Sequence, residues 1–202
     1  MFAGADALMA EIEFGAYLED CLVGARIDLP EGLRLTDYLN ESDDIAMTEA
    51  ALTALDDGRV VTGGDVVVPI TDIHLVEASD ESGGHDRRIR TRSSEVDMVV
   101  GPYRVHGYVH GPTAGDPVAG LSRRQAMIPV TSATIAFLLA GQPQIREREV
   151  VIVNRLLAYI GTPKKSSQSV LDKFGLSPVD PNAKDLTGEL RAETIPKDRR
   201  KG

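Results

Sequence analysis

The chain has 202 residues, a net charge of −9, and only 4% aromatic residues, with no Trp. Acidic charge and scarce aromatic rings argue against nucleic acid as a partner, because such binding needs phosphate neutralisation and base stacking. A single cysteine, Cys21, excludes an internal disulfide and fits a reducing compartment. Neither a secretory signal nor an apolar run of about 18 residues is evident. We therefore expect a cytoplasmic protein without a membrane partner.

The first half of the chain predicts short strands joined by tight turns. Residues 11–27 alternate imperfectly, and we expect one bent strand or two short ones there. Pro30 and Gly32 mark a turn. Further strands are expected at residues 45–55, 59–62, 65–69 and 73–77, with turns at residues 56–58 and 71–72.

A polar corner, residues 34–40, lies between the first turn and the strand expected from residue 45. Its leucines can point inward. Thr36 or Asp37 is expected to cap a single helical turn. Asn40 is expected to end that turn in the left-handed region.

The second half predicts the same kind of structure. Residues 98–110 indicate a strand or hairpin arm, and residues 111–120 a turn rich in Gly and Pro. Residues 127–139 are rich in β-branched side chains, which favour a strand, although residues 133–140 could instead form a helical turn. Two final strands are expected at residues 149–153 and 156–160.

Three segments of the first half align with three segments of the second. They are residues 22–30 (LVGARIDLP) with 104–112 (RVHGYVHGP), 45–50 (IAMTEA) with 128–133 (IPVTSA), and 66–76 (VVVPITDIHLV) with 150–160 (VVIVNRLLAYI). The spacing between aligned segments grows only from 82 to 84 residues, so two single-residue insertions account for it. An internal repeat of this kind predicts two similar β-rich units of roughly 65 residues each.

Residues 24–50 resemble an uncharacterised bacterial domain, whose pattern is a strand, a Leu-Pro-x-Gly turn, an Arg-Leu-(Ser/Thr)-Asp-x-Leu-Asn corner and a strand ending in Thr-x-Ala. The matching residues are Gly24, Pro30, Gly32, Arg34, Leu35, Thr36, Asp37, Leu39, Asn40, Thr48 and Ala50, with Val153, Asn154 and Arg155 matching a late Val-Asn-Arg. The second half lacks the corner and has residues 117–124 in its place. The domain looks like an Sm-like small barrel, and the resemblance supplies no activity.

These observations predict a mainly β fold: a tandem duplication of two small, strongly bent Sm-like β-barrels or sheets, with a short N-terminal segment and a flexible C-terminal tail. The expected ranges are 11–78 for the first unit, 79–96 for a charged flexible connector, 97–161 for the second unit, and 162–202 for a largely disordered tail with a short helix at 170–176. Units this small bury only a modest core. We therefore expect them to pack on each other or on other copies of the chain.

Charge is distributed unequally between the two units. Residues 1–77 hold 3 Arg and 17 acidic residues, whereas residues 98–161 hold 6 Arg and 3 acidic residues. Opposite fields favour contact between the units, or head-to-tail contact between chains. Drift of solvated surfaces is the alternative interpretation.

Motifs that would indicate catalysis or a bound cofactor are missing from the sequence. It contains no HExxH, no paired CxxC, no GxxxxGK[ST], no GxGxxG followed by a helix and no GxSxG. His106 and His110 would lie about 13 Å apart along a strand, too far for one metal ion to span easily. We therefore expect no metal, no cofactor and no enzymatic activity.

Three polar groups remain as candidate binding residues. The corner contributes Arg34, Asp37, Tyr38 and Asn40, which would recognise a peptide, a partner barrel or a small ligand, or else satisfy backbone groups. An arginine-rich run contributes Arg87, Arg88, Arg90 and Arg92, which would bind RNA or an acidic partner, or else fold back on the acidic unit. The Val-Asn-Arg strand end adds Asn154 and Arg155.

The leading hypothesis is a non-catalytic protein that mediates protein–protein contact or self-association. Its basis is the missing catalytic chemistry, the paired small cores and the opposite charges of the two units. The alternative is an Sm-like protein that binds RNA or nucleotides through the basic connector and tail.

Overall fold

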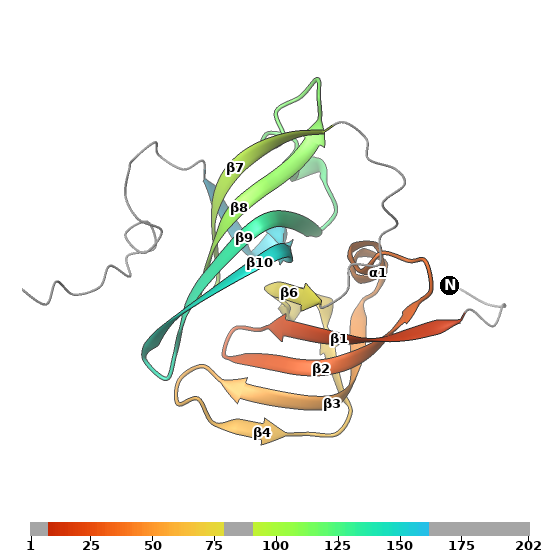
Figure 1. Cartoon of the computed structure of the whole chain (residues 1–202), viewed down its shortest axis with the longest axis vertical. Coiled ribbons are helices and arrows are strands. Elements are labelled where there is room, and N and C mark those ends of the chain that lie inside the picture. Colours follow the sequence, from red (N-terminus) through yellow and green to blue (C-terminus); the bar gives the residue numbers. More distant parts are fainter. Residues whose placement is uncertain (1–7, 79–90, 162–202) are drawn as a thin grey trace, which may run out of the picture. The chain divides into compact units, whose positions relative to one another are not determined.

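The computed structural model describes residues 8–78 and 91–161, which belong to the same unit (Figure 1). We refer to residues 8–78 as the first half and to residues 91–161 as the second half. The predicted tail with its helix at 170–176 lies outside the described residues.

The prediction of a mainly β chain is confirmed. The strands are β1 (Met9–Tyr17), β2 (Cys21–Pro30), β3 (Asp44–Ala54), β4 (Val60–Thr62), β5 (Val66–Pro69), β6 (Leu75–Ala78), β7 (Thr91–Val100), β8 (Tyr103–Pro112), β9 (Met127–Leu139), β10 (Gln142–Asn154) and β11 (Ala158–Gly161). The helices are α1 (Leu35–Glu41) and the short 3-10 helices η1 (Ile70–Asp72), η3 (Leu121–Arg123) and η4 (Arg155–Leu157).

The eleven strands make one antiparallel sheet in the order β11-β7-β8-β9-β10-β6-β1-β2-β3-β4, with β5 also paired to β3. We predicted bent barrels or sheets, and of these two forms the closed barrels are wrong. Closing the first half would require β5 to pair with β6, but β6 pairs with β1 on one edge and β10 on the other. The free edge of β6 is taken instead by β10 of the second half. The β6–β10 ladder thus joins the two halves into a single sheet.

The two halves share the same order of strands and the same irregularities. The β2–β3 ladder shifts register between Gly24 and Arg26, and the β8–β9 ladder shifts between His106 and Tyr108. Each ladder also has a non-glycine residue at positive φ, Glu49 at 52° in β3 and Ser132 at 47° in β9. A bulge bends a strand and strengthens its twist, so both halves bend at the same place.

The two hydrophobic clusters each draw on both halves. The cluster of the second half includes Tyr17 and Leu75 from the first, and the cluster of the first half includes Met127 and Ile152 from the second. The halves therefore complete each other's cores, as expected for units too small to bury much apolar surface alone.

One predicted boundary and one part of the predicted alignment change. Strand β7 begins at Thr91, inside the range 79–96 that we predicted as a flexible connector, because it pairs with β8 along its whole length. Residues 79–90 are outside the described part. In the third aligned segment, Ile45 pairs with Val68 and Ile128 with Val153, so β5 is displaced by one residue from the alignment.

Candidate functional site

The polar corner forms α1, a seven-residue helix whose inward face carries Leu35 and Leu39. The prediction that Asn40 ends a turn in the left-handed region is wrong. Its side chain donates a hydrogen bond to the Thr36 carbonyl (2.8 Å) and to the Met127 carbonyl (2.9 Å), and accepts one from the Met127 amide (2.9 Å). Asn40 therefore holds the first residue of β9, in the other half, much as a neighbouring strand would.

The remaining corner residues lie around that contact. Arg34 is the exposed N-cap residue, and no side chain hydrogen bond caps α1. The prediction that Thr36 or Asp37 caps the helix is therefore wrong. Asp37 and Tyr38 are half-buried, and Tyr38 packs against the cluster of the first half. The corner thus braces the fold at Asn40 and leaves Arg34 facing solvent.

The Val-Asn-Arg strand end makes the reverse contact, from the second half to the first. Asn154 is buried, donates to the carbonyls of Ile73 (3.1 Å) and Ile70 (3.4 Å), and accepts from the Leu156 amide (3.2 Å). Arg155 donates through Nε to the Gln125 carbonyl (2.8 Å) and stays within its own half. Both asparagines named as candidate binding residues are therefore engaged between the halves.

The arginine-rich run is represented in the described residues by Arg92 alone. It lies exposed on β7, opposite Gly111 of β8. Arg87, Arg88 and Arg90 lie outside the described residues, so the interpretation of this run stays a prediction.

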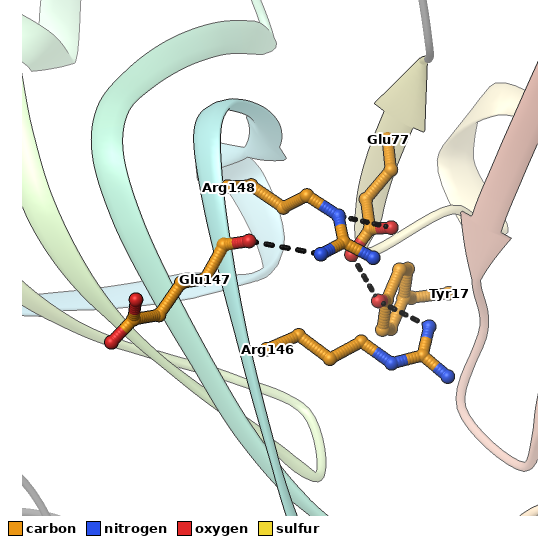
Figure 2. Close-up of polar contacts among 5 residues, drawn as sticks. All are labelled: Tyr17, Glu77, Arg146, Glu147 and Arg148. Atoms are coloured by element: carbon orange, nitrogen blue, oxygen red, sulfur yellow. Dashed lines mark hydrogen bonds and ion pairs between the residues drawn. The ribbon is translucent and has the colours of Figure 1, made fainter.

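A polar cluster at the joint between the halves was not anticipated from the sequence (Figure 2). The Tyr17 hydroxyl donates to the Glu77 carboxylate and accepts from Arg146 (2.9 Å), while Arg148 Nε lies 2.9 Å from Glu77. Burial, reinforced by Glu77, raises the pKa of Tyr17 well above its usual value, so the phenol stays protonated. Arg146 also lies over the Tyr17 ring. The cluster ties β10 to β1 and β6.

Next to this cluster lies an open groove of about 720 Å³ between β1, β2, β6 and β10. Phe14, Val76 and Ile152 supply apolar lining, and the charged residues around it are Glu13, Arg26, Glu49, Glu77, Arg148 and Glu149. Both arginines form ion pairs with carboxylates. Arg26 lies 2.7 Å from Glu11 and 3.3 Å from Glu49, and Arg148 lies 2.9 Å from Glu77. With carboxylates in excess and arginines engaged, the groove disfavours a phosphate or nucleic acid ligand.

His106, His110 and Cys21 are held by ordinary contacts. His106 lies 2.7 Å from Asp97 and 3.3 Å from Glu95, and His110 lies 2.7 Å from Thr131. Within the described ranges, no group of three or more His, Cys, Asp or Glu side chains is placed to hold a metal ion. Burial, with the charge of Asp20, raises the pKa of Cys21 to about 11, so its thiol is protonated at neutral pH.

His74 occupies a tight position between the halves. Its Nε2 lies 3.1 Å from Glu19, and a Cβ at Gly101 would approach that nitrogen to 2.5 Å. Its ring also makes an edge contact with Tyr103, 6.0 Å between centroids. The turn between β1 and β2 and the turn between β7 and β8 therefore meet at one buried ring.

Both ends of the sheet expose apolar side chains. One end carries Val60, Val61 and Val67 on β4 and β5, and the other carries Leu156 and Tyr159 around η4 and β11. These exposed side chains lie on strands at the two ends of the sheet or next to them.

No family model, curated protein or solved structure matches this chain. None of the helices in the described part is long and apolar enough to cross a membrane.

Proposed function

We propose that the protein is a non-catalytic assembly protein: a duplicated β-sheet unit that makes protein contacts through the two ends of its sheet. The observation that carries this proposal is the exposure of apolar side chains on the terminal strands. Tyr159 on β11 is 82% exposed and Val67 on β5 is 63% exposed. Strand edges with apolar side chains are templates for pairing with another chain.

The contacts of the polar residues between the halves support the same function. Asn40 and Asn154 bind backbone groups between the halves, and Arg146 and Arg148 bind Tyr17 and Glu77. Asn40 and Asn154, two of the predicted binding residues, therefore hold the two halves together. The apolar strand ends are left to face other molecules.

RNA binding has less support as an alternative. The groove is lined with more glutamates than arginines, and both of its arginines lie against carboxylates. Binding to a polyanion requires free cations that can neutralise phosphates.

Light scattering of the full chain during size-exclusion chromatography tests the proposal. We expect a mass above that of the monomer, rising with protein concentration. A double variant, Tyr159→Asp with Val67→Asp, should return the protein to the monomer. Leu138→Asp is the matched control, because Leu138 is exposed on β9, away from the ends of the sheet. A wild-type chain that stays monomeric at every concentration and retains no partner in pull-downs would contradict the proposal.

A further inference from the structure

The joint between the two halves of the chain is a short antiparallel ladder between β6 and β10. Val76 lies opposite Ile152, and Leu75 lies opposite Val153. All four side chains are buried, with Leu75 0% and Ile152 3% exposed. The Asn154 amide donates to the His74 carbonyl (2.9 Å) at the end of the ladder. The joint therefore connects the edge of β6 in the first half to the edge of β10 in the second half.

The strand equivalent to β6 in the second half is β11. Tyr17 on β1 pairs with Leu75, and Val99, at the same place in the β7–β8 hairpin, pairs with Tyr159. Tyr159 therefore occupies in the second half the position that Leu75 occupies in the first.

The strands equivalent to β10 in the first half are β4 and β5 together. Ile128 on β9 pairs with Val153, and its aligned residue Ile45 on β3 pairs with Val68. Val68 therefore corresponds to Val153, and Val67 corresponds to Ile152.

The two equivalent edges lie at opposite ends of the sheet. Within the described residues, β11 pairs with β7 alone and β5 with β3 alone. Where the internal joint buries Leu75 and Ile152, the outer edges expose their counterparts Tyr159 and Val67. Two of the four apolar positions of the joint are thus covered inside the chain and exposed at its ends.

We infer that a second copy of this chain covers these positions: β11 of one copy pairs with β5 of the next, repeating the β6–β10 joint between molecules. The inference rests on the proposed function. Because the two edges differ, such contacts join copies head to tail, and they close into a ring or continue as a filament. The basic second half of one copy would meet the strongly acidic first half of the next, which favours this direction.

The joint between molecules is weaker than the joint within the chain. Asn154 corresponds to Pro69, which has no amide hydrogen to donate and no side chain amide to bind carbonyls. The repeated ladder therefore lacks the hydrogen bonds that Asn154 supplies. We expect the assembly to dissociate on dilution while the joint between the halves stays intact.

Disulfide trapping tests the register. In the internal joint the bonded pair is Asn154 with His74, so Leu75 and Val153 form the adjacent non-hydrogen-bonded pair, whose Cα atoms are close enough for a disulfide. The corresponding pair between molecules is Tyr159 with Val68. Full-length chains with Cys21→Ser are mixed, one carrying Tyr159→Cys and a mass tag, the other carrying Val68→Cys.

We expect the mixed pair to form a heterodimeric disulfide under mild oxidation, at least tenfold faster than a control pair in which Val60→Cys replaces Val68→Cys. Val60 is also exposed at that end of the sheet but lies on β4, outside the predicted register. Equal trapping of both pairs, or of neither, would overturn the inference. If light scattering still shows association in that case, the proposed function stands and only this contact fails. A strictly monomeric chain overturns the inference, and one that also retains no partner in pull-downs overturns both.

Discussion

The two halves of the molecule share a frame and differ where they touch each other. Both have the same strand order and a bulge at matching positions of β2 and β8. The second half has η3 where the first has α1, and Asn154 where the first has Pro69. Asn40 on α1 and Asn154 both reach across to the other half. The differences therefore lie in residues that contact the other half. Both halves keep the strand order that leaves β5 and β11 at opposite ends of the sheet.

The largest loss of stability is expected from Asn154→Ala, at a position where the two halves differ. Asn154 is buried, and its loss leaves the Ile70 and Ile73 carbonyls without this donor, which should lower the free energy of unfolding by about 3 kcal/mol. Pro69→Ala, at the corresponding exposed position, should change it by less than about 0.5 kcal/mol. Chemical denaturation measures both. Equal effects at the two positions would show that Asn154 has no special role in the joint.

A smaller effect is expected from Gly101→Ala, which tests the packing of the two turns on His74. The new methyl group would approach His74 Nε2 to 2.5 Å at a residue with φ of 56°. We expect a loss of about 2 kcal/mol from strain and overpacking together. Gly141→Ala is the control, because its φ of 72° gives similar backbone strain with no atom within 4 Å. If the two variants unfold at the same denaturant concentration, the contact with His74 contributes nothing.

The smallest of these effects is expected from Asn40→Ala. The half-buried amide holds both backbone groups of Met127, so its loss should cost about 1.5 kcal/mol. Asn40→Asp should cost at least as much, because a carboxylate would face the carbonyls of Thr36 and Met127. Ser42→Ala removes a hydrogen bond to Tyr38 within the first half and serves as the control. A larger loss in the Ser42 variant would contradict a bracing role for Asn40.

The sequence was a good guide to local structure. The strand expected at residues 127–139 is β9, with the same bounds, because its β-branched side chains and its alternation agree. The aligned repeat predicted matching strands, and the pairing registers bear out that correspondence to within one residue at β5.

The contacts between the two halves could not be predicted from the sequence. Tyr17, Glu77 and Arg146 lie far apart in the sequence, and they meet only because β6 pairs with β10. Asn40 drew attention as part of a polar corner, but its partner, the backbone of Met127, carries no side chain signal. Closed barrels were predicted because nothing in either half alone shows that the edge of β6 is used by the other half.

The central claim is that the joint inside the chain is repeated between chains. Amide hydrogen exchange at several protein concentrations tests it most directly. We predict that protection of residues 66–68 and 158–161 rises with concentration, whereas residues 75–76 and 152–153 are protected throughout, because their ladder lies within one molecule. Exchange at both outer edges that does not change with concentration, in a chain that light scattering shows to be associated, would contradict the claim.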